Sequence, residues 1–311
     1  MIYYSADELI DHLKDYSEIK KLSPFIVGLF IIGIDPEETI ASIIAAINGL
    51  PYVAVGNVIG NSIISIAFCF ALPAIFYSLK FKPVNLFYPV ILLILSTTIL
   101  IASISQTNLI AVGLINLAIF VVYTYRNFKY YEQTNELEVK IDEMEEDGME
   151  AGENVDVESG KSSRHLLIAI IFLILVIIGG EMLVNSAEEL IAITGIDESF
   201  FGFIIIAFLT NVEEITLIIK SIEKNQEEIG VGGMIGKLIW NLGFTFGFSS
   251  LILGAYIGNV ASRINGLILL GLNIHFLFIL KRGKMDKKEG YIYLVVFLIF
   301  IASNIVMAVS V

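Results

Sequence analysis

The sequence contains few charged residues, little histidine and almost no cysteine. Charged residues make up 16% of the 311 positions and hydrophobic residues 56%, and the mean hydropathy is +0.82. This balance excludes an ordinary water-soluble domain. The one cysteine, Cys69, excludes an intramolecular disulfide. His12, His165 and His275 are scattered along the chain, so we expect no histidine cluster for a metal.

Sequence motifs of catalysis are missing as well. The chain has no Walker loop, no Gly-x-Ser-x-Gly elbow and no His-Glu-x-x-His pair. Its first residues lack the basic start and apolar stretch of a cleavable signal peptide. We therefore expect no enzyme, no resident cofactor and no nucleic-acid partner.

Long apolar runs are abundant. Residues 88–105, 165–183 and 291–309 each provide the roughly 20 apolar residues that a helix needs to cross a bilayer. The pattern predicts an all-α, multi-pass protein of the cell membrane, with the lipid bilayer as its main partner. The nine expected spans cover residues 23–48, 52–78, 86–104, 108–125, 165–187, 198–220, 230–255, 260–280 and 290–309.

Lysine and arginine are distributed unevenly over the loops between these spans. Arg263 alone falls on one side, and almost all the others fall on the opposite side. Because basic loops stay in the cytoplasm, we expect the N-terminus, the long central loop and the 281–288 loop to be cytoplasmic.

The central segment 126–164 is acidic and poor in aromatic residues. We expect a solvated, mostly disordered linker between a first half, 1–125, and a second half, 165–311. A calcium-binding role for this linker stays open, although no EF-hand loop is present.

An internal repeat relates the two halves. "DPEETIASII" at 35–44 aligns with "NVEEITLIIK" at 211–220, and "VGNVIGNSIISIAF" at 55–68 aligns with "VGGMIGKLIWNLGF" at 231–244. Both pairs are separated by the same interval. In the predicted topology the paired spans cross the membrane in opposite directions, which indicates an inverted repeat and a secondary transporter with its site near the midplane.

The first half carries one span fewer than the second half. "SAEEL" at 186–190 follows a full apolar helix, whereas the related "SADEL" at 5–9 lies close to Met1. Either the first helix of the repeat is absent or the recorded start lies too late.

Polar residues inside the predicted spans are the candidate site. Pro36 should break its helix, because it has no N–H to donate. Asp35 and Glu38 are three residues apart, as are Asn211 and Glu214, so each pair should share a helix face. Intramembrane acids are costly and are functional candidates by default, although such groups can also simply join helices. The expected cation ligands are Glu38, Glu214, Asp35, Thr210, Asn211, Asn61, Ser65 and Asn241.

Other polar residues receive lesser roles. Glu37 and Glu213 point about 100° away from the ligand face, so we expect them at the rim of the cavity as accessory groups. Asn57 is expected to cap or pack, and Trp240 to pack. Glu181, Glu188 and Glu189 are expected to face an interface or water.

Lys237 is the unexpected cation among these acids. It could extend to the membrane surface, but its mid-helix position favours an internal pair with Glu38 or Glu214. We expect it to act as a tethered counter-ion. Carboxylate, amide and hydroxyl oxygens suit hard cations such as Na⁺, Ca²⁺ or Mg²⁺.

In these residues the chain resembles the calcium/cation antiporters, in particular the sodium/calcium exchangers. The resemblance covers 23–78 and 198–255. Family members carry two inverted repeats in a ten-helix fold, each with a Gly-Thr-Ser-x-Pro-Glu motif and a Gly-Asn-x-x-Gly-Ser segment. Gly56-Asn57-Val58-Ile59-Gly60 preserves the second segment.

The resemblance implies that Glu38 and Glu214, which match the motif glutamates, bind the transported cation. Thr210 matches the motif threonine, whereas Ile34 replaces it in the first half. Asp35 and Asn211 stand at the motif serines, Glu37 and Glu213 at the prolines, and Asn61 and Lys237 at the serines of the second segment.

The expected function is secondary antiport of a divalent cation, Ca²⁺ first, against Na⁺ or H⁺, by a family fold that lacks its first helix. A non-transporting ion sensor or membrane subunit derived from an exchanger is the alternative. A cation channel is a third and weaker alternative for the function.

Overall fold

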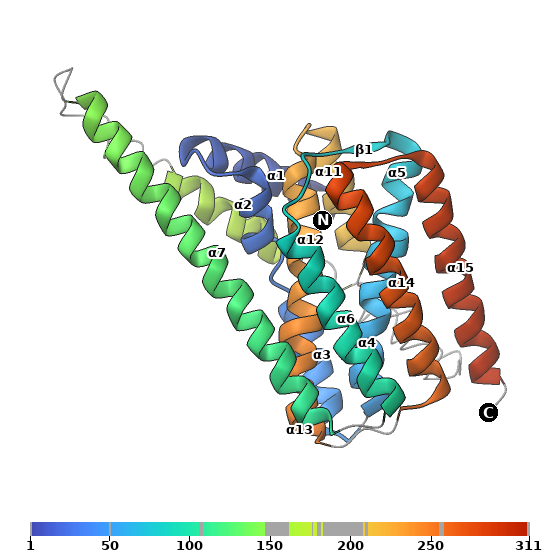
Figure 1. Ribbon diagram of the computed structural model, residues 1–311. Coiled ribbons are helices and arrows are strands. Elements are labelled where there is room, and N and C mark those ends of the chain that lie inside the picture. Colours follow the sequence, from blue (N-terminus) through green and yellow to red (C-terminus); the bar gives the residue numbers. More distant parts are fainter. Residues whose placement is uncertain are drawn as a thin grey trace.

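The described part of the protein is a bundle of helices (Figure 1). The computed structural model describes residues 2–49, 51–105, 108–146, 162–175, 177–178, 182, 208, 211–254 and 258–309. Within these residues, strand structure is confined to one antiparallel pair, β1 (Leu79–Lys80) and β2 (Lys284–Met285). The predicted all-α class is therefore confirmed.

The described helices of the first half are α1 (Ile2–Ile19), α2 (Pro24–Ile31), α3 (Pro36–Ile47), α4 (Pro51–Ile64), α5 (Ala71–Tyr77), α6 (Phe87–Ser105) and α7 (Leu109–Glu146), with a π-helix at Ser65–Cys69. Those of the second half are α11 (Val212–Glu223), α12 (Glu227–Ile239), α13 (Phe246–Leu253), α14 (Val260–Arg282) and α15 (Lys287–Val309), with a π-helix at Trp240–Thr245. A further apolar helix, Ser162–Leu175, precedes them.

Among the described residues, six helices are long and apolar enough to cross a membrane. They are Ala54–Tyr77, Phe87–Ile104, Leu109–Lys129, Glu227–Leu253, Val260–Arg282 and Lys287–Met307. These match six of the predicted spans. The expected span 23–48 is divided into α2 and α3. The expected spans 165–187 and 198–220 are described only in part, mainly by the helix Ser162–Leu175 and by α11.

The outer surface of these helices is apolar. Exposed side chains include Ile94 on α6, Val121 on α7, Phe278 on α14 and Leu298 on α15. Large apolar groups facing outward are unfavourable in water but suit contact with lipid. Together with the lengths of the helices, they identify a multi-pass membrane protein.

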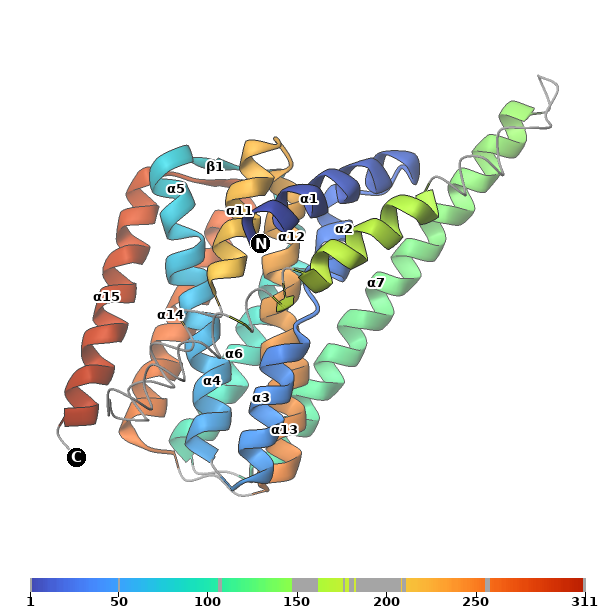
Figure 2. The ribbon, with the colours of Figure 1, turned by 180° about the vertical axis from the view of Figure 1, so that it is seen from behind.

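Matching segments of the two halves run in opposite directions. In Figure 1, α4 and α5 rise from the lower end of the bundle to its upper end, whereas α12 and α13 descend. Likewise α2 and α3 descend, and α11 rises; the reverse view in Figure 2 agrees.

The loops rich in lysine meet at the upper end of the bundle. There β1 pairs with β2, and Lys82 Nζ lies 3.2 Å from Glu228 Oε1 at the start of α12. Arg263 lies at the other end, where its guanidinium donates hydrogen bonds to the carbonyl oxygens of Ser103 and Gly258, at 3.2 and 3.3 Å. The two ends therefore differ in charge as the sequence predicts.

Helix α7 is longer than expected. It continues as helix to Glu146 and extends beyond the upper end of the bundle (Figure 1). The expectation of a mostly disordered segment is therefore wrong for residues 126–146. The physical reason is composition: "NELEVKIDEMEE" at 135–146 is rich in glutamate and other residues that favour a helix.

Helices α2 and α12 pack backbone against backbone. A Cβ atom on Gly232 would overlap the carbonyl oxygen of Phe25, and one on Gly236 would overlap that of Leu29. A Cβ on Gly28 would overlap the carbonyl oxygen of a residue of α12. Small residues at membrane helix contacts allow such close approach, so glycine fixes the broken helix of the first half against the second.

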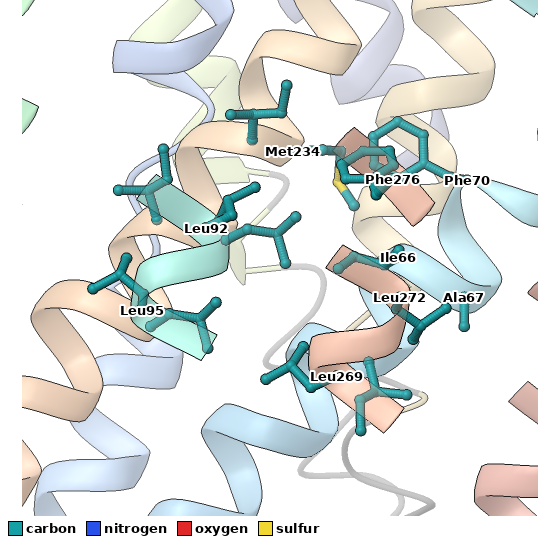
Figure 3. Close-up of a cluster of buried hydrophobic side chains, with 14 of the residues drawn as sticks. Ile66, Ala67, Phe70, Leu92, Leu95, Met234, Leu269, Leu272 and Phe276 are labelled. Carbon is teal, nitrogen blue, oxygen red and sulfur yellow. The ribbon is translucent and has the colours of Figure 1, made fainter. Parts of the chain in front are cut away.

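A buried apolar cluster joins both halves (Figure 3). It combines side chains from the π-helix Ser65–Cys69 and the residue after it, from α6, from α12 and from α14. The labelled members are Ile66, Ala67, Phe70, Leu92, Leu95, Met234, Leu269, Leu272 and Phe276.

Candidate cation-binding site

The site begins at the break between α2 and α3. Helix α2 ends at Ile31, and α3 starts at Pro36, whose fixed φ and missing N–H suit a first helical position. Asp35 is the N-cap, and its Oδ1 accepts a hydrogen bond from the backbone N–H of Glu38 at 3.4 Å. The predicted interruption is confirmed, with Asp35 just outside the helix instead of within it. Its second oxygen, Oδ2, stays available to other helices.

Glu38 is buried and surrounded by amide donors. Asn61 donates to its Oε1 at 2.7 Å, and Asn57 donates to its Oε2 at 2.5 Å. Asn57 also donates to Ser42 Oγ at 3.1 Å. Sequence reasoning missed this role of Asn57, although its place one turn before Asn61 put both on one face of α4.

Glu214 is buried in the second half and pairs with a cation of the protein itself. Lys237 on α12 forms an ion pair with Glu214. The same ammonium lies 3.1 Å from Asp35 Oδ2 and 4.0 Å from Glu213 Oε1. The side chain of Lys237 is only 7% exposed, so it points into the bundle. The sequence predicts a pair of Lys237 with either Glu38 or Glu214, and the structure pairs it with Glu214.

Hydrogen bonds between polar side chains connect the halves directly. Ser65 Oγ donates to Asn211 Oδ1 at 2.8 Å, and Asn241 Nδ2 donates to Asp35 Oδ2 at 2.8 Å. The Oδ1 of Asn61 lies 3.3 Å from Ser65 Oγ and 3.5 Å from Asn241 Nδ2. Together with the contacts of the two glutamates, these bonds form one continuous polar network, which we call the central network.

A small cavity borders this network. Its volume is about 20 Å³, enough for one water molecule or small ion. Asp35, Glu213, Glu214 and Lys237 provide its polar wall, and apolar groups that include Leu173 provide the rest. Carboxylate oxygens thus line an enclosed space inside the membrane-spanning part of the protein.

A layer of hydroxyl groups lies beside the network. The hydroxyls of Thr39 and Thr245 are 2.7 Å apart, and the indole N–H of Trp240 donates to Thr39 Oγ1 at 2.8 Å. The packing role expected for Trp240 is therefore incomplete. Trp240 is the first residue of the π-helix Trp240–Thr245. Its equivalent in the first half, Ile64, directly precedes the π-helix Ser65–Cys69. Such turns are frequent at functional sites.

Most of the predicted site residues meet in one place. The central network contains Glu38, Glu214, Asp35, Asn211, Asn61, Ser65, Asn241 and Lys237, with Glu213 facing Lys237. Thr210, the side chain of Glu37, and Glu181, Glu188 and Glu189 lie outside the described part.

The charges of the network favour a further cation. Asp35, Glu38, Glu213 and Glu214 are all buried. In the described part of the chain, the ammonium of Lys237 faces three of them, Asp35, Glu213 and Glu214. Buried charges require partners of opposite sign. Oxygen donors of this kind suit alkali and alkaline-earth ions better than soft metals.

An ion-pair group at the upper end fastens α1 to α11. Lys224 Nζ lies 2.6 Å from Asp11 Oδ2 and 3.0 Å from Asp7 Oδ2. Burial alone would raise the pKa of Asp7, but hydrogen bonds from Lys224 and Lys220 outweigh burial and lower it. The hydrogen bonds that Lys224 donates to Asp11 and Asp7 raise the pKa of Lys224.

The expectation that the histidines form no cluster is wrong. His12 and His165 lie side by side, with Asp15 next to them. Sequence separation hid this contact, because the two histidines lie on different sides of the acidic segment.

Comparison with known proteins agrees with this geometry. The sodium/calcium exchanger protein family matches residues 1–129 and 164–306. An uncharacterized membrane protein of Methanocaldococcus jannaschii is 24% identical over 308 residues, which cover 97% of this chain and 94% of that protein. The inner membrane protein YrbG of Escherichia coli is 23% identical, over 93% of this chain and 88% of that protein.

Among solved structures, the sodium-calcium exchanger NCX_Mj, soaked with Na⁺ and Sr²⁺, has the same fold. The TM-score is 0.77 at 20% identity, over 97% of this chain and 94% of that chain. With the family match spanning most of its length, the chain belongs to the sodium/calcium exchanger protein family.

Proposed function

We propose that this member of the sodium/calcium exchanger family is a secondary antiporter that exchanges a divalent cation, Ca²⁺ first, for Na⁺ or H⁺. The observation that carries the proposal is the central network. In it Glu38 and Glu214 are buried and are linked through Asn61, Asn241, Asp35 and Lys237. Acidic groups are retained at such depth in a membrane protein mainly where they serve transport.

Glu38 and Glu214 would be the central ligands of the transported cation. Asp35, Asn61, Ser65, Asn211 and Asn241 would complete the oxygen shell, as would Thr210, which lies outside the described residues. Glu213 would attract cations at the cavity, and Glu37 would do so from the matching position of the first half. The support for this assignment is contact: each described ligand touches another member of the network.

Alternating access would follow from the arrangement of the halves. Equivalent helices of the two halves run in opposite directions around the network (Figures 1 and 2). Inverted halves of this kind can rock around a fixed site and open it first to one side and then to the other. The basic upper end, with the N-terminus and the acidic segment, would face the cytoplasm.

Lys237 would act as a tethered counter-ion. Its ammonium lies among Asp35, Glu213 and Glu214. It balances carboxylate charge there that a bound metal ion would otherwise balance. Withdrawal of Lys237 from Glu214 would then accompany binding of the divalent cation, and the lysine would return as that cation leaves.

Flux measurement in proteoliposomes tests the proposal. Uptake of ⁴⁵Ca²⁺ driven by an outward Na⁺ gradient, or by a pH gradient, should be lost in the Glu38→Gln, Glu214→Gln double variant. Glu228→Gln is the matched control, since Glu228 lies at the exposed start of α12 and pairs with Lys82. Full exchange by the double variant would refute the assignment.

The ion pair of Lys237 also favours a second candidate, an ion sensor that binds cations without transporting them. A permanently bound ammonium at Glu214 could prevent release of an ion to one side. Calorimetry would then detect Ca²⁺ binding that depends on Glu38, while no gradient of Na⁺, K⁺, H⁺, Ca²⁺ or Mg²⁺ drives flux.

A further inference from the structure

Two histidines and one aspartate converge where α1 meets the helix Ser162–Leu175. His12 and Asp15 are three residues apart on α1 and share one face. His165 comes from the other helix, on the far side of the acidic segment in sequence. We call these three residues the His–Asp cluster.

The potential ligand atoms of the His–Asp cluster are close together. His12 Nδ1 lies 2.9 Å from His165 Nδ1, and His165 Nδ1 lies 3.4 Å from Asp15 Oδ2. All three atoms lie within 4.8 Å of one another. The His–Asp cluster belongs to neither the central network nor its cavity.

A shared proton satisfies this arrangement poorly. Each neutral imidazole has one donor and one acceptor nitrogen, and both His12 Nδ1 and Asp15 Oδ2 approach the same nitrogen of His165. A single N–H at that position can point well at only one of them. One divalent cation, in contrast, can accept lone pairs from both nitrogens and the carboxylate oxygen.

We propose that the His–Asp cluster is a binding site for Zn²⁺ or a similar borderline divalent cation. Zinc binds nitrogen at about 2.0–2.1 Å in tetrahedral geometry, which places neighbouring ligand atoms roughly 3.3 Å apart. The observed separations of 2.9 and 3.4 Å lie on either side of that value. Imidazole ligands favour such ions over Ca²⁺, which prefers oxygen.

The surroundings support ligand binding. Phe172 stacks on the ring of His12, with centroids 6.2 Å apart and planes at 14°, and so fixes its orientation. The side chains of His165 and Asp15 are 25% and 46% exposed, which leaves a path for an ion to enter and room for water as a fourth ligand. The nearby Lys14 has its own partner, Glu18, at 4.0 Å.

A metal ion at this position would fasten α1 to the helix Ser162–Leu175. That helix carries Leu173, which lines the cavity beside Glu213 and Glu214. The bound metal would therefore restrain a wall of the cation cavity without entering it. This site is additional to the proposed transport function and does not depend on it.

Zinc titration of the full chain in detergent tests the proposal. The protein is purified without a polyhistidine tag, stripped with EDTA and titrated with Zn²⁺ by calorimetry, and Co²⁺ is used as a spectroscopic probe of the ligand field. We expect one site, whose affinity falls by more than the ~10–100-fold typical of losing an outer-shell partner in His12→Gln, His165→Gln and Asp15→Asn.

Matched controls separate this site from general metal binding and from the transport site. His275→Gln changes a histidine that lies 3.2 Å from the hydroxyl of Tyr293 instead, and Asp11→Asn changes a carboxylate one turn away on α1. Both should keep the zinc affinity, as should Glu38→Gln combined with Glu214→Gln.

Folding is checked by thermal unfolding of each variant in EDTA. A variant that unfolds at the wild-type temperature without metal is folded, and zinc should then raise the unfolding temperature of the wild type and of His275→Gln but not of His165→Gln. The proposal would be overturned if His12→Gln, His165→Gln and Asp15→Asn bound zinc as tightly as the wild type.

Discussion

The two halves share a common set of contacts but differ in charge. Ser65 to Asn211 and Asn241 to Asp35 are equivalent cross-half contacts, and both measure 2.8 Å. Within each half, the residue at the same repeat position approaches the glutamate: an uncharged asparagine in the first half and a lysine in the second. The repeat thus fixes the geometry, while two pairs of equivalent positions, Asp35 with Asn211 and Asn61 with Lys237, make the site electrically asymmetric.

This asymmetry gives the two glutamates different neighbours. Glu38 receives hydrogen bonds from two neutral amides. Glu214 has an ammonium against it. A cation entering the network should therefore bind first next to Glu38. The ammonium of Lys237 should repel this cation and so oppose its movement toward Glu214.

Removing the lysine should have the largest effect. Lys237→Asn gives the second half the residue of the first, and leaves Asp35, Glu213 and Glu214 without their ammonium. Loss of one partner of a buried ion pair costs about 3–5 kcal/mol. We expect a lower unfolding temperature in cation-free detergent and recovery on adding Ca²⁺, measured by thermal unfolding with and without the ion.

Lys82→Asn is the control for that measurement, because Lys82 is exposed and its pair with Glu228 should contribute only about 0–1 kcal/mol. Equal unfolding temperatures of Lys237→Asn and the wild type in cation-free detergent would show that the buried pair has no role in stability.

Moving the lysine to the other half tests the comparison directly. Asn61→Lys alone adds a second ammonium to the network, and cation binding should be abolished. Asn61→Lys combined with Lys237→Asn restores the wild-type net charge and should recover part of the affinity. Calorimetric titration with Ca²⁺ over the double-mutant cycle gives the coupling energy; an additive result would mean that the two positions act independently.

Much of the site was predictable because the sequence repeats itself. The shared spacing of Glu38 and Glu214 relative to their following helices identified the pairs that meet in the network. Pro36 indicated where the helix would break, since its missing N–H has a strictly local consequence. Sequence alone could also place six of the nine expected spans, because long apolar runs act independently of their neighbours.

The remaining features depend on tertiary contact. Asn57 resembles a capping residue in sequence, and only the packing of α3 on α4 brings it to Glu38. The choice of Lys237 between the two glutamates follows from helix positions that spacing does not fix. His12 and His165 are brought together by the folding of chain segments far apart in sequence. Helix α7 extends past its expected end because the helix propensity of its acidic residues outweighs the repulsion between their charges.

Removing an amide that only the first half has should produce an intermediate effect. Asn57 is replaced by Gly233 in the repeat, where a Cβ would approach Ile32 Cγ2 to 2.6 Å. Asn57→Ala removes the hydrogen bond to Glu38, and bonds to charged groups contribute about 1.5–3 kcal/mol. We expect Ca²⁺ affinity, measured by calorimetry, to change by roughly 10–100-fold.

Ser62→Ala is the matched control for Asn57→Ala, because Ser62 is buried near Asn57 on α4 and its hydroxyl has no hydrogen-bond partner among the described residues. An unchanged Ca²⁺ affinity in Asn57→Ala would show that the hydrogen bond from Asn57 to Glu38 has no role in cation binding.

The smallest effect is expected where α1 of the first half touches α11 of the second. Asp7 is partly exposed and pairs with Lys220 and Lys224, each at 3.0 Å, so Asp7→Asn should cost about 0–1 kcal/mol.

The folded state lowers the pKa of Asp7 below 3.8. Its contribution to stability is therefore present above that pH and is lost as the pH falls through the lowered pKa. Thermal unfolding of the wild type and Asp7→Asn between neutral and acid pH should show a difference that vanishes in acid. A difference that persists in acid would mean that Asp7 contributes by packing, and the two halves would then be joined here by shape instead of charge.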